Sequence, residues 1–308
     1  MRLFVTRKMA CVAVAMTCAM ISLCPAVFAA DEAAAAAKAV CAKYAGAVVK
    51  VSMVFKTQVS MEGRGAENEE SKTEVIGTII DPSGLTVVSL YQSSPEEQFR
   101  SMGYGDEKGI KLTAETTDVK IRLGTGQELP AKIVLRSEDL DLTFIRPAVK
   151  PATPLPYVDL TQSCKLEALD QIVNLDRLGK VAGRIIAVSL DRVLAVIEKP
   201  RTFYVPANSG SLGSPIFSLD GKIAGIIVSR RLPASGNSDS SMFSGYDDTQ
   251  LYVALPAEDV LETAKQAPEQ AIPEVKPTPA PAPAAAPAPK PAAPPKPAPA
   301  APPKPPKN

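Results

Sequence analysis

Short runs of apolar and β-branched residues alternate with turn-forming residues through most of the chain. Turn signals such as Asp81-Pro-Ser-Gly84, Gly124-Thr-Gly126 and Leu219-Asp-Gly221 separate the runs. Runs of this length, with Gly, Pro and Asp between them, predict the strands of an all-β barrel or sandwich. The predicted strands are Ala47–Val54, Glu74–Ile80, Leu85–Leu90, Val119–Leu123, Ala131–Leu135, Leu142–Ile145, Gln171–Leu175, Arg184–Ser189, Val193–Ile197, Tyr204–Val205, Ser214–Phe217, Ile223–Val228 and Leu251–Leu255.

Helical patterns are confined to the two ends of this β-rich region. Asp31–Tyr44 is rich in Ala, the strongest helix former. Pro256–Lys265 has Pro at its start and acids in its first turn, which favours a helix. Two long polar stretches, Ser93–Thr117 and Leu232–Asp248, predict surface loops. We therefore expect a helical lead-in at residues 30–45 and one folded domain at residues 46–267.

The first 29 residues have the pattern of a secretory signal peptide. Arg2, Arg7 and Lys8 precede the apolar stretch Ala10–Cys24, which is short for a bilayer core about 30 Å thick. Val27-Phe-Ala29 places small residues where signal peptidase needs them, so cleavage after Ala29 is predicted. The alternative is an uncleaved anchor. No later apolar run could span a membrane, so we expect an exported protein that is periplasmic, secreted or held in the cell envelope.

Residues 268–308 are almost entirely Pro, Ala and Lys and hold more than half of the 30 Pro of the chain. Such a composition builds neither a core nor a sheet, which predicts a disordered, extended and semi-rigid spacer. Its cationic residues have no acid after Glu274; they are Lys276, Lys290, Lys296, Lys304 and Lys307. The tail is therefore either an inert linker or a contact to a Pro-binding partner, the cell wall or another anionic envelope component.

The most informative feature of the composition is that the chain contains no His. It excludes imidazole bases and nucleophiles, and with them Ser-His-Asp catalysis, Cys-His catalysis and most zinc sites. The formal net charge of +1 provides no field that would attract nucleic acid. The chain has no phosphate loop, dinucleotide fingerprint, metal-spaced Cys pair or EF-hand pattern, so no cofactor and no metal is predicted.

Cys41 and Cys164 are the cysteines that would remain after signal cleavage. In an oxidising compartment two cysteines can form one disulfide. The other interpretation is two free thiols that pack as small hydrophobic groups. Both stay open, because the sequence does not tell whether their Cα atoms come within about 7 Å of each other.

Three segments contain strands and turns in a distinctive order. Gly77–Tyr91 is a strand, a Pro-Gly turn and a strand; Ala131–Ile145 is a strand, an acidic turn and a strand; Asn208–Ile226 is a Gly/Ser loop that runs into a hairpin. In this order and spacing the chain resembles the trypsin-like serine peptidases of the HtrA/Deg type, over roughly residues 48–265. The resemblance implies a trypsin-like double β-barrel with a short C-terminal helix, followed here by the Pro-rich tail.

The resemblance aligns the catalytic His, Asp and Ser of the family with Tyr91, Asp141 and Leu212. A serine nucleophile needs a neighbouring base, and the base needs an orienting acid. A phenol, with a usual pKa near 10, accepts a proton poorly at neutral pH, and a leucine offers no nucleophile. Only the orienting acid is present, so the resemblance implies a catalytically degenerate member of the family.

The loop before the third hairpin keeps Gly210 and Gly213. In the family such glycines permit a turn that aims two N–H groups into an oxyanion hole. Here the donors would be the N–H groups of Gly210 and Leu212, which could bind a carbonyl or a carboxylate. The alternative is that a Gly-rich loop is needed only to join the two strands.

Serines in the same loop offer another route to catalysis. Ser209, Ser211 and Ser214 are candidates, but each would need a base other than His. A dyad with Lys222 requires burial that lowers the lysine pKa by several units. The sequence thus predicts an inactive protein that binds protein or peptide in the envelope, with two alternatives: a serine endopeptidase with a non-His mechanism, and an envelope tether acting through the tail.

Overall fold

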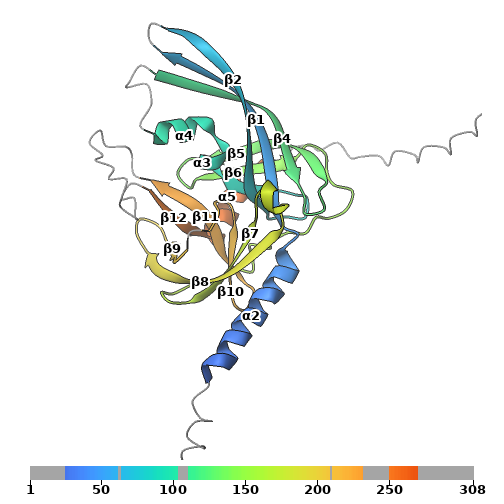
Figure 1. Ribbon diagram of the computed structural model, residues 1–308, viewed down its shortest axis with the longest axis vertical. Helices are drawn as coiled ribbons and strands as arrows, with labels where there is room; N and C mark the ends of the chain where they lie inside the picture. The colour runs from blue at the N-terminus through green and yellow to red at the C-terminus, as the bar shows by residue number, and fades with distance from the viewer. Residues whose placement is uncertain (1–24, 62–63, 103–109, 209, 232–249, 270–308) are drawn as a thin grey trace, which may run out of the picture. The chain divides into compact units, whose positions relative to one another are not determined.

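The computed structural model of the chain describes residues 25–61, 64–102, 110–208, 210–231 and 250–269 (Figure 1). Residues 1–24 of the expected signal peptide lie outside this part of the chain, as do the expected loop Leu232–Asp248 and residues 270–308 of the expected tail. The expected cleavage position after Ala29 falls within the first described helix, α2 (Pro25–Tyr44), which begins before the expected lead-in.

Six antiparallel strands close into a first barrel, in the order β1-β2-β3-β6-β5-β4. They are β1 (Val48–Met61), β2 (Arg64–Ile79), β3 (Thr86–Ser89), β4 (Ile110–Arg122), β5 (Glu128–Ser137) and β6 (Leu142–Pro147). Alternate residues of a strand share one face, and in β1 those that face inward are fully buried: Val49, Val51, Met53 and Phe55. Apolar side chains of the neighbouring strands complete this core.

Six further strands close into a second barrel, in the order β10-β11-β12-β9-β8-β7. They are β7 (Gln171–Arg177), β8 (Ile186–Ile197), β9 (Phe203–Pro206), β10 (Pro215–Ser218), β11 (Ile223–Arg231) and β12 (Gln250–Pro256). Its core contains Leu166, Ile172, Val193, Tyr204, Leu212, Ile216, Ala224, Ile227 and Ala254. The predicted all-β, trypsin-like double β-barrel is thereby confirmed.

A third apolar cluster joins the two barrels to each other and to the terminal helices. It contains Ile76 and Phe144 of the first barrel and Phe217 of the second. Helix α2 adds Tyr44, whose ring stacks on that of Phe217 with centroids 4.6 Å apart. Helix α5 (Ala257–Ala264), the predicted terminal helix, adds Val260. The hydrophobic effect therefore holds both barrels and both helices in one unit.

Two predicted boundaries are wrong. Arg184–Ser189 and Val193–Ile197 belong to one strand, β8, because its pairing with β7 continues through Leu190, Asp191 and Arg192. The expected loop Ser93–Thr117 contains α4 (Pro95–Ser101) and the first half of β4. Ser94 caps α4 by accepting a hydrogen bond from the Glu97 N–H, a signal that the polar composition of the stretch concealed.

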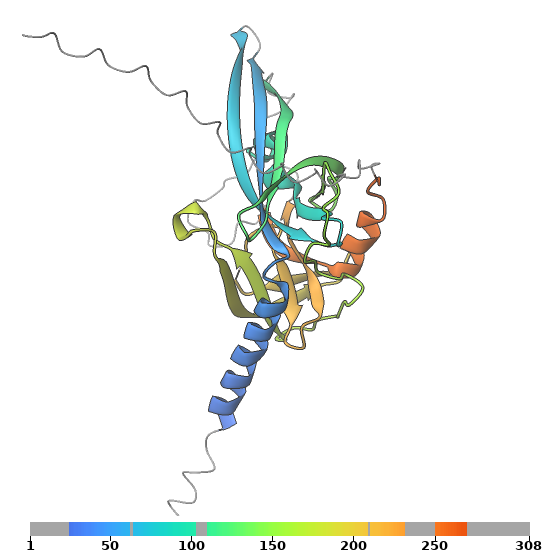
Figure 2. The ribbon, with the colours of Figure 1, turned by 90° about the vertical axis from the view of Figure 1, so that its right-hand side faces the viewer.

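Strands β1, β2 and β4 are longer than predicted and continue together beyond the rest of the first barrel, as Figures 1 and 2 show. The extension consists mainly of polar residues, and its pairing is continuous, for example between Phe55 and both Ser71 and Thr116. Backbone pairing on both sides of β1 therefore extends strands that their side chains alone do not predict. We call this extension the arm; it comprises residues 55–61, 64–71 and 110–116.

Cys41 and Cys164 are both free thiols. Cys41, in α2, packs against the cluster between the barrels, whereas Cys164 packs against the core of the second barrel. The disulfide, one of the two predicted alternatives, is not formed, because the two side chains belong to different clusters. Among the described residues no helix is long and apolar enough to cross a membrane.

Polar contacts also join the barrels and fix the loop of the second barrel against the first. Arg184 donates from Nε to both carboxylate oxygens of Glu74 in β2 and from Nη2 to Oε2, the last hydrogen bond being the shortest at 2.7 Å. Thr78 Oγ1 donates to the carbonyl of Gly213 at 2.8 Å while fully buried. The loop that contains Leu212 thus lies directly on the first barrel.

Candidate functional site

Asp141 lies in the turn between β5 and β6 and has a left-handed backbone, with φ of +56°. Its carboxylate is buried and accepts three hydrogen bonds. Oδ1 accepts from the Tyr91 N–H at 2.7 Å; Oδ2 accepts from Ser89 Oγ at 2.8 Å and from the Ser229 N–H at 2.6 Å. Because Ser229 belongs to β11 and the other two donors to the first barrel, Asp141 ties the two barrels together.

A short helix, α3 (Leu90–Ser93), presents Tyr91 to this carboxylate. Ser89 is its N-cap and accepts from the Gln92 N–H while donating its own hydroxyl proton to Asp141. Leu90 N–H donates to the Asp141 carbonyl at 3.0 Å. The hairpin predicted over Gly77–Tyr91 therefore ends in a capped helical turn whose first N–H groups converge on one acid.

The pKa of Asp141 is raised from 3.8 to about 6. Burial is the main cause, because it disfavours the charged carboxylate. The hydrogen bonds from Ser229, Tyr91 and Ser89 and the positive charge of Arg231 oppose the shift without cancelling it. The protonation of Asp141 therefore changes with pH just below neutrality.

The ring of Tyr91 packs against the core of the second barrel and under a guanidinium group. Arg231 lies over the ring, with its central carbon 3.3 Å from the ring centroid. Nε and Nη2 of Arg231 are buried and have no hydrogen-bond partner among the described residues. Tyr91 therefore serves as an aromatic platform for a cation, a role that differs from that of a proton acceptor.

Leu212, at the position that the resemblance assigns to the nucleophile, is only 2 % exposed. Its side chain lies in the core of the second barrel, in the same cluster against which Tyr91 packs. The chain can take this course because the next residue is Gly213, with φ of +85°. A Cβ atom there would lie 2.3 Å from the carbonyl oxygen of Ile76, so any side chain would displace the loop from β2.

Gly210 also packs too closely for a side chain, since a Cβ atom would lie 2.1 Å from Asn174 Nδ2. Farther along the loop, the Gly213 N–H donates to the Ile227 carbonyl at 2.8 Å. Within the described part of the chain, the N–H groups of Gly210 and Leu212 donate to no other group. The glycines of this loop are therefore required by packing, and the two predicted donors are not used inside the protein.

The serines of the loop have separate environments. Ser211 Oγ donates to Asp176 Oδ2 at 2.5 Å. Ser214 is fully buried, and its hydroxyl has no hydrogen-bond partner in the described part of the chain; Ser209 lies outside that part. Lys222 is exposed in the turn between β10 and β11 and pairs with Asp220 at 3.2 Å. The dyad with Lys222 is thus wrong, because its ammonium group lies in solvent rather than beside a serine.

A different lysine lies near Ser211 and Asp176. Lys50 of β1 is 7 % exposed, and burial lowers its pKa against the opposing charges of Asp176 and Glu74. Asp176 Oδ1 is buried without a hydrogen-bond partner. The sequence did not single out Lys50 or Asp176, because each acquires its environment only when the two barrels meet.

A cleft of about 470 Å³ opens beside Tyr91 and Asp141. Residues of both barrels line it: Leu90, Tyr91, Glu97, Glu138, Asp139, Leu140, Asp141, Pro200, Arg201, Phe203, Ser229, Arg230 and Arg231. Leu212 is absent from this lining, since its side chain points into the core. The structure therefore brings Tyr91 and Asp141 to the cleft and removes Leu212 from it.

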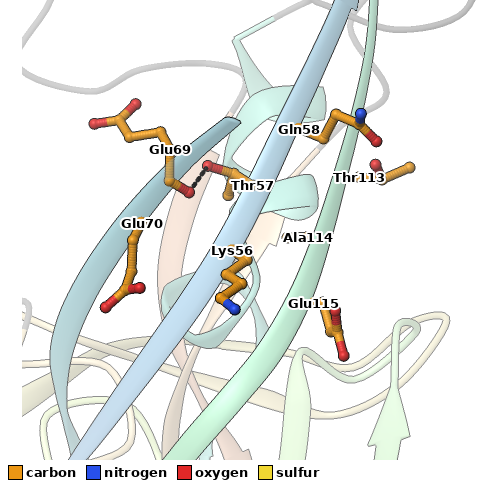
Figure 3. Close-up of a pocket in the computed structure, with 8 residues that line it drawn as sticks. All are labelled: Lys56, Thr57, Gln58, Glu69, Glu70, Thr113, Ala114 and Glu115. Carbon is orange, nitrogen blue, oxygen red and sulfur yellow. Dashed lines mark hydrogen bonds between the residues drawn. The ribbon is translucent and has the colours of Figure 1, made fainter. Parts of the chain in front are cut away.

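A larger hollow, of about 620 Å³, lies on the arm (Figure 3). There Lys56 in β1 lies opposite Glu70 in β2 and Glu115 in β4 in the register of the sheet. Thr57 Oγ1 donates to the Glu69 carbonyl at 3.1 Å. The charged side chains that line this hollow are all exposed, whereas the smaller cleft contains the buried carboxylate of Asp141. We therefore place the candidate site in the smaller cleft.

The structure adds residues that the motifs did not indicate, above all Ser89, Ser229 and Arg231. Ser89 could have been found as an N-cap before a helical turn; Ser229 and Arg231 carry no local signal. Among the described residues no group of His, Cys, Asp and Glu could hold a metal ion. The cleft offers the carboxyl group of Asp141, the ring of Tyr91 and the guanidinium groups of Arg230 and Arg231.

No protein-family model matches the chain, and no curated protein matches it. Among solved structures, the chain is similar to the MamO protease domain from Magnetospirillum magneticum, at 13 % identity and a TM-score of 0.44, over 71 % of this chain and 96 % of that one. It is also similar to a serine-to-alanine variant of the HtrA-type protease AlgW, with a decapeptide, at 14 % identity and a TM-score of 0.48, over 75 % of this chain and 66 % of that one.

Proposed function

We propose that this protein is an exported, catalytically inactive protein of trypsin-like peptidase fold that binds an extended segment of another protein. One observation carries the proposal: the residue at the nucleophile position, Leu212, is buried in the core while the cleft beside Tyr91 and Asp141 stays open. A cleft without reactive groups can bind a chain but cannot cleave it.

The lack of catalysis follows from the groups that face the cleft. Asp141 is hydrogen-bonded by Ser89, Tyr91 N–H and Ser229 N–H, as an orienting acid would be, but it has no imidazole to orient. The ring of Tyr91 is stacked with Arg231. Without a base that removes a hydroxyl proton, acyl transfer has no nucleophile.

The edge of β11 supports binding of an extended segment. Ser229, Arg230 and Arg231 line the cleft and, among the described strands, pair with β12 alone. On the other side the Ser229 N–H already donates to Asp141, so the part of the edge that can pair lies beyond this N–H group. A strand with one free edge can accept a further strand through backbone hydrogen bonds, with side chains of the ligand in adjacent pockets. The cleft thus combines a backbone edge with cations and an aromatic ring.

Selection from a random library of ten-residue peptides, followed by fluorescence anisotropy, tests this proposal on the full chain. Glu138→Trp should fill the cleft from its exposed rim and weaken binding of a selected peptide at least tenfold. Glu115→Trp, on the arm, is the matched control and should leave binding unchanged. Failure to select any peptide, or equal binding by Glu138→Trp and the wild type, would overturn the proposal.

A second candidate function, a serine endopeptidase with a non-His mechanism, has one observation in its favour. Ser211 Oγ lies 2.5 Å from Asp176 Oδ2, and Lys50 is buried nearby with a lowered pKa. None of these three residues lines the cleft beside Tyr91 and Asp141 or the hollow on the arm. The inactive protein is therefore the preferred interpretation, since the cleft that could hold a substrate lies away from Ser211.

Export and the role of the tail complete the proposal. Intact-mass analysis of the protein from its native host should give a chain that begins at Ala30, and a chain that begins at Met1 would contradict export by signal cleavage. A tether through the tail predicts release from the envelope fraction when residues 268–308 are removed. Unchanged fractionation would leave the tail as a spacer.

A further inference from the structure

A buried cation without a counter-charge lies where the two barrels meet. Arg177, at the end of β7, is 8 % exposed. Its guanidinium donates to three backbone carbonyls: Nε to Val48 at 2.6 Å, Nη2 to Ala45 at 2.8 Å and Nη1 to Arg184 at 3.0 Å. No carboxylate among the described residues comes within ion-pair distance of it.

The three carbonyls orient the guanidinium but leave its charge uncompensated. Burial lowers the pKa of Arg177, and no nearby charge opposes that effect. A buried charge with no partner is costly, and proteins normally pair such a group with an anion. A guanidinium has five N–H donors, so one N–H on each terminal nitrogen remains for another acceptor.

A cavity of about 310 Å³ adjoins the guanidinium, and we call it the Arg177 pocket. Apart from Arg177, its lining is short or apolar: Ala45, Gly46, Leu123, Gly124, Thr125, Pro156 and Ile186. A Cβ atom at Gly124 would lie 3.0 Å from Nη2, so the absence of a side chain keeps that edge of the guanidinium uncovered. The volume is at the lower end of the range for small-molecule sites.

We propose that the Arg177 pocket binds the carboxylate of a small apolar carboxylic acid. The carboxylate accepts hydrogen bonds from the two remaining N–H groups of Arg177, a pairing that guanidinium groups form readily. The hydrocarbon part lies against Leu123, Pro156 and Ile186. The lining contains no second cation, which favours a monoanion with an apolar body over a phosphate.

The site joins elements that are distant in sequence, and its occupation has a structural consequence. The carbonyl acceptors of Arg177 lie at the junction of α2 and β1 and in the turn before β8, while Leu123 and Gly124 follow β4. A ligand that neutralises Arg177 only in the folded state stabilises this junction by mass action. The inference is independent of the cleft beside Tyr91 and Asp141, since none of its residues lines that cleft.

Isothermal titration calorimetry and thermal melting of the full chain with hexanoate test the proposal, with 1-hexanol and inorganic phosphate as comparison probes. Hexanoate should bind once per chain and raise the melting midpoint. Hexanol and phosphate should each bind at least tenfold more weakly, because hexanol lacks the carboxylate and phosphate lacks the hydrocarbon chain. Equal binding of hexanol and hexanoate, tighter binding of phosphate, or no binding of hexanoate would overturn the proposal.

Two variants locate the binding without disturbing the hydrogen bonds of Arg177. Thr125→Trp fills the mouth of the pocket from an exposed turn and should weaken hexanoate binding at least tenfold, with the melting midpoint of the free protein unchanged. Val181→Trp, on a fully exposed position of the neighbouring turn and outside the lining, should leave binding unchanged. If Thr125→Trp binds hexanoate as the wild type does, the ligand lies elsewhere and the assignment is wrong.

Discussion

The two barrels contribute to the candidate site in opposite ways. The first barrel presents a buried carboxylate, Asp141, whose two oxygens accept three hydrogen bonds. The second barrel presents a loop in which Leu212 points into the core and the glycines are held by close packing. The first barrel places a polar group, Asp141, at the cleft, whereas the loop of the second barrel directs the apolar side chain of Leu212 into the core.

This difference shows that a retained acid does not by itself indicate catalysis. Asp141 accepts from Ser89 and Tyr91 in one barrel and from Ser229 in the other, so it has a structural role as a tie between the barrels. Gly213 likewise has a structural reason to persist, since no other residue fits against Ile76. Leu212 contributes buried apolar surface to the core of the second barrel, which stabilises the fold.

The largest expected effect comes from emptying the core of the second barrel. Leu212→Ala should lower the free energy of unfolding by about 2–5 kcal/mol, the range for a buried leucine that leaves a cavity. Urea denaturation monitored by circular dichroism measures the loss. Leu190→Ala, at a position 43 % exposed on β8, is the control and should change it by less than about 1 kcal/mol. Equal small losses would mean that Leu212 is not part of the core.

The next effect concerns the first barrel and depends on pH. Because the pKa of Asp141 is raised from 3.8 to about 6 on folding, the folded state binds the proton more tightly than the unfolded state. Its contribution to stability is therefore fully present below pH 4 and is lost as the pH rises through 6. The shift corresponds to roughly 3 kcal/mol in total.

Comparison with Asp141→Asn isolates this contribution from all other titrating groups. The difference in unfolding free energy, wild type minus Asp141→Asn, should fall between pH 4 and pH 7 in urea titrations. A difference that stays constant, or that grows with pH, would contradict the assigned burial and would remove the contrast between the two barrels.

The smallest expected effect is a difference in unfolding free energy between two glycine variants, which separates backbone strain from packing in the loop of the second barrel. Gly213 and Gly126 both have φ near +90°, but only Gly213 has backbone atoms where a Cβ would lie. Gly126→Ala should lower the unfolding free energy by about 1–2 kcal/mol through φ alone. Gly213→Ala should cost roughly 1–3 kcal/mol more, through overpacking against β2. Equal losses would show that the loop can move away from Ile76.

Most of the fold could be predicted from the alternation of apolar runs and turns. The hairpins at Asp81-Pro-Ser-Gly84 and Leu219-Asp-Gly221 are set by local turn chemistry, so their strands were found. The arm was not, because its polar side chains give no periodic signal and its strands are held by backbone pairing with two neighbours. The continuity of β8 escaped prediction because Asp191 and Arg192 interrupt its apolar pattern, whereas its pairing with β7 continues through both residues.

The candidate site could be predicted only in part. The placement of Tyr91 and Asp141 beside one cleft followed from the order of motifs, whereas the burial of Leu212 required the fold. The contact of Arg231 with Tyr91, and those of Arg177 with the carbonyls of Ala45 and Val48, span more than a hundred residues of sequence, for which no local pattern exists.

The loss of catalysis, which is the central claim, is tested most directly by labelling the full chain with a fluorophosphonate probe and locating any adduct by mass spectrometry. Trypsin serves as the positive control, and Ser211→Ala as the variant that removes the one loop serine bonded to a carboxylate. We predict no adduct on the wild type at neutral pH, because Ser211, which is bonded to the carboxylate of Asp176, does not line the cleft beside Tyr91 and Asp141. An adduct on Ser211, absent from Ser211→Ala, would contradict it and establish the serine endopeptidase instead.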